Sequence, residues 1–394
     1  MNIDMARNKG ASLFNLKLLN QLQIRRVIYY NGPLTRQQIA NELGVSLPTV
    51  TTNVAAMLAD GLLTEYEGES TTSHAGRRPQ LVDFNADSRF AVGLEFGPYG
   101  AFACVTNLRG RILYKKELSS PSKNYERMLI DVSTQCQMII RESKVPPHQV
   151  LGIGLGLPGF IDSQRGTVRT GLYSSWADRE LAADLRRQTY LPVWIDNNAR
   201  MRTYWREMFS GRDTPSTFVY LFVSKGIACP LMIKNDILAG KHASAGEIGH
   251  TTILPDGPIC PTCGRKGCLE SLSSEAAILA QVQATLGHDT TWDMQKVLMA
   301  QRQGNSTVCD IMKQAVGYLG LAAANIFNFI SPNLLSIDGL IFENEENRKE
   351  LIEVVQSNLF GLSTEEAKIE FLPHNSYSGA SGAAAFVVRQ SLLA

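Results

Sequence analysis

The sequence has no excess of charge of either sign. Its 394 residues include 38 lysines and arginines against 37 aspartates and glutamates, which gives a formal net charge of +1. A basic field over the whole protein is therefore excluded, and any binding of nucleic acid must come from a local group of residues. With 44% hydrophobic and 19% charged residues the composition is typical of a globular protein, and the length predicts two or three domains.

Long hydrophobic runs are absent as well. The most apolar stretches, 151–157 and 319–330, are too short to span a membrane, and the N-terminal residues lack the apolar run of a secretion signal. We therefore expect a cytoplasmic protein without membrane insertion. Cysteine is scarce, and four of the seven cysteines stand singly in apolar surroundings that are typical of buried thiols: Cys104, Cys136, Cys229 and Cys309.

The other three cysteines lie close together in the sequence. Cys260, Cys263 and Cys268 follow His250 within one predicted loop. Three thiolates and one imidazole make a tetrahedral ligand set for Zn²⁺ with no position left for water, so the sequence predicts a structural zinc ion. Disulfides or unrelated buried cysteines are the alternative, but the spacing is typical of metal ligands.

Three sections follow one another along the chain. Residues 1 to about 67 are predicted to be mainly helical, and 68–80 to form a polar turn or linker. From residue 91 strands alternate with helices, which predicts an α/β body of two lobes. The predicted strands are 91–95, 101–106, 111–118, 150–155, 192–195, 218–223, 231–234, 334–337 and 368–371. The predicted helices are 125–143, one from about 199, 274–286, 307–330, 346–359 and 382–393.

The N-terminal section predicts a winged helix-turn-helix. Helices are expected over 22–30, over 36–43 and from 46 to about 60, with Thr35 and Ser46 as N-caps. The small side chain of Ala40 lets two helices approach, and Gly44 permits the left-handed turn between them. Residues 61–66 and 81–84 would form the strands of the wing. A three-helix packing module without nucleic acid is the alternative.

The third helix of this unit would read DNA. Its N-terminal half would expose short hydrogen-bonding and methyl-bearing side chains to base edges in a major groove. The turn 76–79 would place an arginine in a narrow minor groove, although a solvated linker explains that turn equally well. The predicted DNA-binding residues are Arg36, Ser46, Leu47, Thr49, Thr51, Thr52, Asn53, Arg77 and Arg78.

The body resembles the ROK family, which groups bacterial sugar kinases with repressors that carry a winged helix in front of the same body. The resemblance rests on the segments 152–162, 245–250, 267–270 and 330–333, and it covers nearly the whole chain. It implies an α/β, actin-like, two-lobed sugar-kinase fold with a sugar in the cleft. Carboxylates and amides can form hydrogen bonds with the hydroxyls of a sugar. For the two glutamates among the expected contacts, Glu247 and Glu270, support of the cysteine loop is the alternative role. The sugar contacts that the resemblance implies are Pro158, Gly159, Asn197, Asn198, Glu247, His250 and Glu270.

The segments that a ROK kinase needs for phosphoryl transfer differ in this chain. By resemblance the catalytic base, an aspartate in the kinases, is replaced by Asn198, and an amide cannot accept the proton. The first phosphate loop reads Glu95-Phe-Gly-Pro-Tyr99, in which proline removes an amide donor. The second loop is 224–230, and the adenosine-side Gly-Gly pair is Asp338-Gly339. Asp196 would remain as a base only if the strand geometry continued past it in a shifted register.

These features predict a sugar-responsive transcriptional regulator, most simply a repressor, and not an enzyme. Its expected partners are operator DNA, a sugar or sugar phosphate effector and further copies in a homodimer or homotetramer, with a sugar-transport protein as one more candidate. The expected domains are the winged helix over 1–85, a smaller lobe over 86–196 plus 380–394, and a larger lobe over 197–379 with the zinc loop. An active ROK sugar kinase with an accessory DNA-binding domain is the first alternative, and a scaffold that binds a partner protein is the second.

Overall fold

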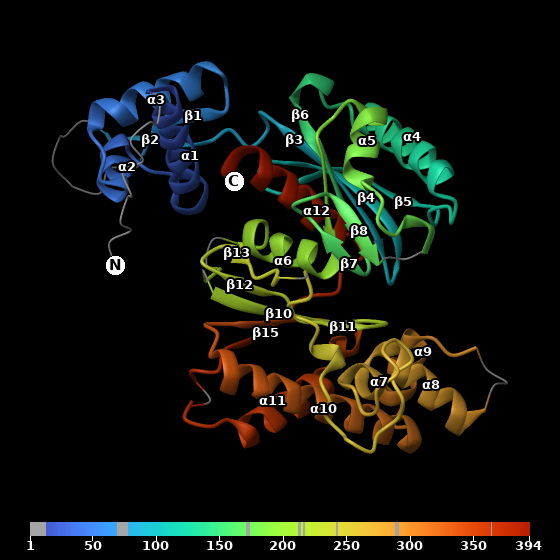
Figure 1. The fold of residues 1–394 in the computed structure, drawn as a ribbon. Coiled ribbons are helices and arrows are strands. Elements are labelled where there is room, and N and C mark those ends of the chain that lie inside the picture. The colour runs from blue at the N-terminus through green and yellow to red at the C-terminus, as the bar shows by residue number, and fades with distance from the viewer. Residues whose placement is uncertain are drawn as a thin grey trace.

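The protein consists of a small N-terminal unit that packs beside a larger body with two β-sheets (Figure 1). The structure is a computed structural model, and it describes residues 13–68, 78–170, 174–211, 214–215, 217–241, 243–287, 291–363 and 365–394. Within these ranges no helix is both long enough and apolar enough to cross a membrane.

The N-terminal unit is a winged helix-turn-helix. Helices α1 (Leu13–Asn31), α2 (Arg36–Leu43) and α3 (Leu47–Ala59) precede the antiparallel strands β1 (Leu63–Glu67) and β2 (Gln80–Phe84). Thr35 caps α2 in a capping box with Gln38, Gly44 ends that helix with a φ of 63°, and Ser46 caps α3. The predicted helices of the turn and the predicted pairing of the wing strands are therefore confirmed.

The first lobe of the body is built on a five-stranded sheet with the order β5-β4-β3-β6-β9. These strands are β3 (Phe90–Gly97), β4 (Gly100–Asn107), β5 (Ile112–Leu118), β6 (Val150–Leu157) and β9 (Val193–Asn197). Helices α4 (Tyr125–Ser143) and α5 (Leu181–Thr189) cover one face, and α12 (Ser378–Val388) lies on the other (Figure 1). A small hairpin, β7 (Phe160–Asp162) with β8 (Thr167–Thr170), follows β6.

Helix α12 lies directly against the strands of this sheet. A Cβ atom at Gly93 of β3 would lie 1.9 Å from the carbonyl oxygen of Ala380, and one at Gly154 of β6 would lie 2.1 Å from that of Ala383. Only glycine leaves room for the helix backbone at these two positions. Helix α6 (Asn198–Met208) packs against α12 and connects the two lobes.

The second lobe is built on a sheet with the order β13-β12-β10-β14-β15, and β11 pairs with β10. The strands are β10 (Thr217–Val223), β11 (Ile227–Ala228), β12 (Leu231–Ile233), β13 (Asp236–Ile237), β14 (Leu335–Asp338) and β15 (Ile369–Phe371). The helices are α7 (Leu269–Ser273), α8 (Glu275–Leu286), α9 (Met294–Arg302), α10 (Ser306–Ile330) and α11 (Glu345–Asn358). Alternate residues of β10 face opposite sides: Val219 and Leu221 pack against α10, and Tyr220 belongs to the cluster that includes α6 and α12.

Some elements differ from the sequence-based predictions. The elements α5, α9 and the β7–β8 hairpin were not expected, because each is short: the helices have nine residues each and the strands three and four. The closing helix predicted over 382–393 begins earlier, at Ser378, and after Val388 widens into a π-helical turn, Arg389–Leu393. Helix α1 begins at Leu13, before the predicted residue 22. The sequence did not indicate this earlier start, because Leu16 and Leu19 are about half exposed and produce no one-sided apolar pattern. The domain boundaries given above stay a prediction.

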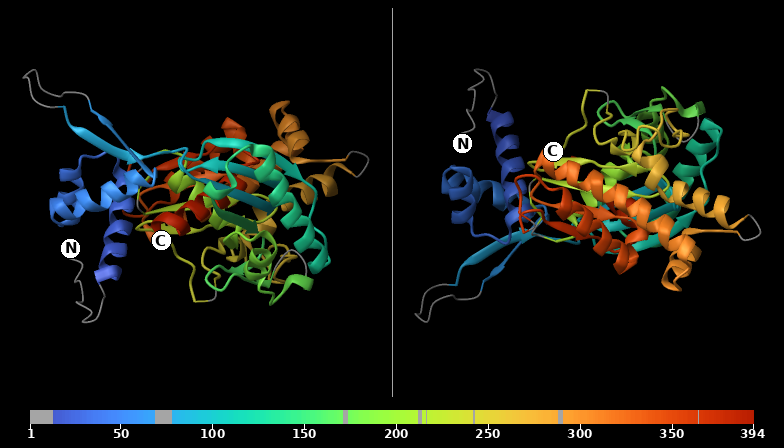
Figure 2. Two further views of the ribbon diagram at one scale, coloured as in Figure 1. Left: turned by 90° about the horizontal axis from the view of Figure 1, so that it is seen from above. Right: turned by 90° about the horizontal axis from the view of Figure 1, so that it is seen from below.

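The winged helix packs against the body through hydrogen bonds and a shared hydrophobic core. The hydroxyl of Tyr29 donates to the carbonyl oxygen of Leu108 at 2.9 Å, and that of Tyr30 donates to Glu207 of α6 at 2.8 Å. Arg109 donates to the carbonyl oxygen of Tyr29 at 2.7 Å and to Asp83 of the wing at 2.6 Å. Buried apolar residues of the winged helix form one continuous cluster with those of α6 and α12. The N-terminal unit lies beside the C-terminal end of the chain in both views of Figure 2. The body therefore sets the orientation of the DNA-reading unit.

Candidate functional site

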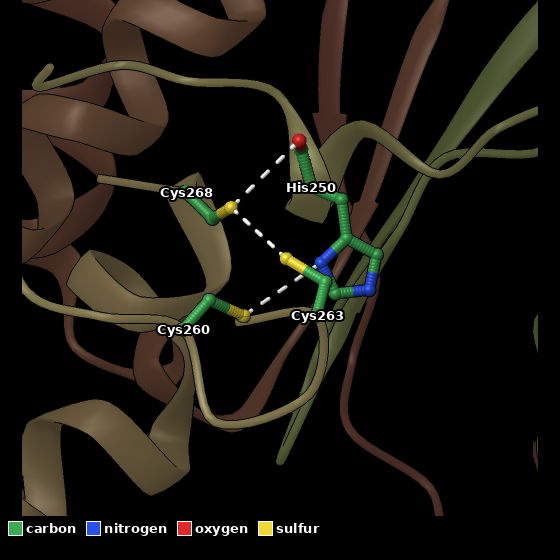
Figure 3. A group of neighbouring side chains, drawn as sticks. All are labelled: His250, Cys260, Cys263 and Cys268. Carbon is green, nitrogen blue, oxygen red and sulfur yellow. Dashed lines mark hydrogen bonds between the residues drawn. The ribbon is translucent and has the colours of Figure 1, made fainter. Parts of the chain in front are cut away.

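The cysteine loop brings four side chains together. The ligand atoms of His250, Cys260, Cys263 and Cys268 all lie within 4.8 Å of one another (Figure 3). The Sγ atoms of Cys263 and Cys268 are 3.5 Å apart, and Sγ of Cys260 lies 3.8 Å from Nδ1 of His250. These separations match the edges of a tetrahedral site with metal–sulfur bonds of about 2.3 Å. The four side chains therefore fit a metal ion, as predicted.

The same distances argue against disulfide bonds. A separation of 3.5 Å between sulfur atoms is far longer than a disulfide bond of about 2.05 Å, and all seven cysteines are free. Hydrogen bonds from the backbone and side chain of Arg265 lower the pKa of the Cys263 thiol to about 6. A side-chain N–H of Arg265 also donates to the carbonyl oxygen of His250 at 3.0 Å. Arg265 therefore favours a thiolate at the site and ties the two ends of the loop together.

Three of the predicted sugar residues meet where β9 runs into α6. The side-chain oxygen of Asn197 caps α6 by accepting hydrogen bonds from the N–H groups of Ala199 and Arg200. Its amide nitrogen donates to the carbonyl oxygen of Gly159 at 2.9 Å, and Asn198 is buried beside it. Asn197 therefore fixes the loop after β6 to the start of α6, which places the backbone of Gly159 next to both asparagines.

The other predicted sugar residues come from the second lobe. Burial raises the pKa of Glu247, and the charges of His250 and Arg200 act in the opposite direction. Glu270 accepts hydrogen bonds from the N–H of Ile227 at 3.3 Å and from the hydroxyl of Thr262 at 2.7 Å. Because Thr262 lies between Cys260 and Cys263, Glu270 supports the cysteine loop, which is the alternative role stated for it above.

A buried ion network on α6 crosses between the lobes, and no sequence pattern predicted it. Arg202 forms a two-point ion pair with Glu95 of β3, at 3.1 Å and 2.9 Å, and also binds Asp338 of β14 at 3.2 Å. The hydroxyl of Tyr220 donates to Asp338 at 2.7 Å, and the guanidinium lies 4.6 Å from the ring centre of Phe222. The side chains of the three ionic groups are at most 3% exposed. Such a bidentate arrangement in a dry interior binds the two lobes to α6.

Asp196 lies near the end of strand β9, where the strand runs into helix α6. Strand β9 ends at Asn197, and Asn198 is already the first residue of α6. Strand geometry therefore extends one residue past Asp196, and the shifted register, in which Asp196 and Asn198 would point the same way, stays an alternative. Asp196 is buried and forms an ion pair with Arg200 at 3.0 Å, while burial raises its pKa to about 6.

Tyr99 of the first phosphate-loop segment reaches across to the second lobe. Its hydroxyl donates to Glu275 at the start of α8 at 2.8 Å. Its ring packs edge-on against Phe222 and against His374, with ring centres 6.4 Å and 4.8 Å apart. Burial raises the pKa of Glu275 to about 7. The tyrosine thus occupies space between the lobes and adds a second polar bond across them.

Helix α3 exposes most, but not all, of the residues predicted to read DNA. Ser46, Leu47, Thr51 and Thr52 are exposed and Thr49 is half-buried. The predicted exposure of Asn53 is wrong: the residue is 5% exposed, and its amide donates to the carbonyl oxygen of Thr49 at 2.8 Å, because it lies on the inner face of the helix.

The three arginines that were predicted to contact DNA differ in their surroundings. Arg36 forms an ion pair with Glu65 of the wing and is about a quarter exposed. Arg78 is exposed and lies 3.8 Å from Glu67, whereas Arg77 falls outside the described residues. The structure therefore leaves Arg78 on the wing surface and gives Arg36 a partner within the unit.

Comparison with known proteins decides the family. Residues 91–390 match the ROK family, which is most of the body. The chain belongs to the ROK family. Residues 17–64 match a winged helix-turn-helix DNA-binding family. The predicted combination of a winged helix and a ROK body is therefore confirmed.

Repressors and kinases both occur among the proteins that this ROK chain resembles. The xylose repressor of Bacillus subtilis is 27% identical over 333 residues, which cover 84% of this chain and 84% of that repressor. A glucokinase of Halalkalibacterium halodurans is 32% identical over 267 residues, which cover 64% of this chain and 80% of the kinase. The crystal structure of a ROK family transcriptional regulator, a homologue of the E. coli MLC protein, superposes with a TM-score of 0.82 at 20% identity and covers 96% of this chain and 98% of that one. This match shows that the ROK chain shares the fold of that regulator over 96% of its length.

The contact between α1 and α6 of this ROK protein is expected to respond to pH. Burial raises the pKa of Glu207 to about 7, whereas an unfolded glutamate titrates near 4.3. The folded protein therefore holds this proton more tightly, and the stabilising contribution is complete below about pH 4 and is lost as the pH rises towards 7. The variant Glu207→Gln keeps an acceptor for the Tyr30 hydroxyl, and we expect it to lose this pH dependence.

Denaturant unfolding at several pH values between 5 and 8 measures the effect. Between pH 5 and 7 the free energy of unfolding should fall more for wild-type protein than for Glu207→Gln. The difference between the two decreases should be a few kcal/mol at most. The exposed Glu353 of α11 provides a matched control, because Glu353→Gln should leave the wild-type slope unchanged. Equal slopes for wild type and Glu207→Gln would contradict the assignment.

Proposed function

We propose that this ROK protein is a sugar-responsive, DNA-binding transcriptional repressor of genes for carbohydrate use. The observation that carries the proposal is an exposed recognition helix, α3, on a unit whose orientation is set by a sugar-kinase body. Bound sugar in such a body would change the position of α3 relative to DNA. The resemblance to a xylose repressor over 84% of both chains supports the same function.

The geometry of α6 supports a loss of phosphoryl transfer. By family resemblance Glu95 and Asp338 stand where a kinase holds the phosphates and the adenosine of ATP, and here Arg202 binds both. Tyr99 fills further space between the lobes. At the position of the catalytic base Asn198 has an amide, which cannot accept a proton. The carboxylate of Asp196 is already paired with Arg200. We therefore infer a degenerate kinase body that has kept its sugar-binding residues.

We infer that the metal of the cysteine loop is a structural Zn²⁺ ion. Three thiolates and one imidazole suit zinc in softness and geometry, and the complete ligand set leaves no position for catalysis. Nδ1 of His250 faces the sulfur atoms, whereas its second ring nitrogen points away from them (Figure 3). His250 can therefore serve the metal and hydrogen-bond a sugar at once, with Glu247 and Glu270 as further contacts. The predicted contacts of Pro158, Gly159, Asn197 and Asn198 would complete the pocket from the first lobe.

The proposed assembly is a homodimer on a palindromic operator. Two winged helices would place their α3 helices in successive major grooves of the two half-sites. Closure of the lobes around sugar would alter the spacing between the two α3 helices and weaken the fit to the operator.

Replacing Thr51 by glutamate is expected to abolish specific DNA binding. Thr51 is exposed near the start of α3, and a carboxylate there would meet the phosphates of the duplex as well as lose any contact to a base. We expect a loss of affinity of about 100-fold, because each good base contact contributes about 1–3 kcal/mol and repulsion adds to it. DNase I protection of the gene's own upstream region measures the change, with and without a panel of sugars.

The matched control is Thr285→Glu, which adds the same charge at an exposed position of α8. This variant should protect the DNA as the wild type does. The proposal fails if wild-type protein gives no protection under any condition. Release of ADP at a catalytic rate from ATP and a hexose or pentose would favour the kinase alternative instead.

A further inference from the structure

A cavity of about 530 Å³ lies between the winged helix and the body, where the ends of α1, β2 and α6 meet. Further lining residues come from the turn between β4 and β5 and from the turn between β12 and β13. The described lining residues include none of those predicted to bind sugar or DNA. The volume lies within the range of about 300–1,000 Å³ that is usual for small-molecule sites. The cavity is therefore a candidate site separate from the cleft between the lobes.

Aromatic side chains form much of the wall of this cavity. They are Tyr29 and Tyr30 of α1, Phe84 of β2 and Phe209, which directly follows α6. The ring of Tyr29 meets the rings of Tyr30 and Phe84 edge-on, with ring centres 5.4 Å apart in both pairs. The guanidinium carbon of Arg109 lies 4.5 Å from the ring centre of Tyr29 and 5.6 Å from that of Phe84. Two of these rings therefore already interact with a cation, as electron-rich ring faces do.

The formal charges around the cavity do not balance. Among the described lining residues the charged ones are Asp83, Glu207 and Arg109, which leaves one negative charge in excess. Asp83 and Arg109 form an ion pair at 2.6 Å, so the excess charge belongs to Glu207. A concave site with an excess of negative charge favours a cationic ligand over a neutral or anionic one.

One oxygen atom of the Glu207 carboxylate has no donor. The residue is 5% exposed, and its Oε1 atom accepts the hydrogen bond from the hydroxyl of Tyr30 at 2.8 Å. Its Oε2 atom is buried, and no described residue donates to it. Burial raises the pKa of Glu207 to about 7, although the charge of Arg389 acts in the opposite direction. Buried acceptors are rarely left without a donor, and a ligand in the cavity that Glu207 lines can supply one.

We propose that this cavity binds a small primary amine with an apolar body. The ammonium group would donate to Oε2 of Glu207 and supply the counter-charge that the carboxylate lacks. The apolar body would pack against the rings of Tyr30 and Phe209. This site goes beyond the proposed function, because a repressor that responds to a sugar in the cleft does not require it.

An amine in this cavity acts on the contact between the winged helix and the body. It touches α1 and β2 on one side and α6 on the other, and it therefore stabilises the two units in this arrangement. Because the same contact sets the orientation of α3, the amine is a second effector of DNA binding that acts independently of sugar.

Calorimetric titration of the full chain, without sugar or DNA, tests the site with three probes. Phenethylamine, 2-phenylethanol and 3-phenylpropionate share a phenylethyl body and end in a cation, a neutral hydroxyl and an anion. We expect phenethylamine to bind with a Kd below about 1 mM and at least about 10-fold more tightly than the alcohol. The carboxylate should bind more weakly than the alcohol, because Glu207 repels it.

Two variants separate the charge from the apolar wall. Glu207→Gln keeps an acceptor for the Tyr30 hydroxyl and should lower the affinity for the amine by about 10- to 100-fold, with the affinity for the alcohol unchanged. Phe209→Leu keeps the carboxylate and should weaken the binding of both the amine and the alcohol by about 3- to 10-fold. The matched control Glu353→Gln removes the same charge at an exposed position of α11 and should change neither affinity.

Three results would overturn the proposal. The first is an amine that binds no more tightly than the alcohol or the carboxylate, and the second is equal affinity of Glu207→Gln and Glu353→Gln for the amine. The third is that no probe binds more tightly than about 1 mM, in which case the cavity holds water only. Since neither sugar nor DNA is present, failure here leaves the repressor proposal standing, and a failure of DNA protection does not affect this site.

Discussion

Purified Cys263→Ser protein is expected to contain no stoichiometric zinc and to have lost the sugar response of its DNA binding. The substitution removes one of four ligands and leaves an exposed position of the loop otherwise unchanged. Structural zinc sites in small peptides bind with apparent free energies of about 10–16 kcal/mol, so the loss of one thiolate is a large perturbation. Without the metal the loop would no longer hold Thr262 against Glu270, and the proposed sugar contacts of the second lobe would lose their placement.

Zinc content by inductively coupled plasma mass spectrometry and DNase I protection with a sugar panel are the two measurements. DNA binding without sugar should persist, because the winged helix contacts α6 and the C-terminal turn and lies far from the cysteine loop (Figure 1). Cys309→Ser is the matched control, since this cysteine lies outside the loop and should retain both zinc and sugar response. Metal-free wild-type protein that still responds to sugar would contradict the structural role of zinc.

The variant Arg202→Met is expected to destabilise the body by about 3–5 kcal/mol. The cost arises because Glu95 and Asp338 would remain buried in the interior without a counter-charge. All four tryptophans, Trp176, Trp194, Trp205 and Trp292, lie in the body, so tryptophan fluorescence during urea unfolding follows the unfolding of the body.

A second variant separates the lost ion pairs from simple misfolding. Combining Arg202→Met with Glu95→Gln and Asp338→Asn removes the uncompensated charges and should recover part of the lost free energy of unfolding. The control Arg187→Met breaks a pair whose arginine is 70% exposed and should cost less than about 1 kcal/mol. If the free energy of unfolding of Arg202→Met lies within about 1 kcal/mol of the wild-type value, the network does not hold the lobes together.

The helix-turn-helix could be predicted from sequence because its signals are local. Caps at Thr35 and Ser46 and the left-handed turn at Gly44 each depend on a few neighbouring residues. The same local argument failed at Asn53. Its helical position was identified correctly, but which face of α3 is covered depends on packing within the winged helix, and that face buries Asn53.

The glycines of β3 and β6 show a similar limit. In the sequence the repeated glycines of 152–159 are part of the resemblance to a sugar kinase. In the structure Gly93 and Gly154 are required because the backbone of α12, more than 200 residues later in the chain, lies against them. The residue pattern of a strand cannot predict which helix, so distant in sequence, will pack against it.

The sequence by itself determined the elements whose chemistry lies within a short stretch. These are most of the longer strands and helices in their order, the caps of the DNA-reading unit and the four ligands His250, Cys260, Cys263 and Cys268, which one loop brings together. Backbone geometry and ligand spacing act over a few residues, so a pattern can reveal them.

Only the tertiary structure decided how charges pair across the lobes. Arg202 lies 107 residues from Glu95 and 136 from Asp338, and the sequence of α6, which contains three arginines, does not indicate these partners. The hydrogen bond from Tyr30 to Glu207 likewise joins segments far apart in the chain. The physical reason is that a buried charge is stable only beside its counter-charge, and the fold, not the local sequence, selects which groups become neighbours.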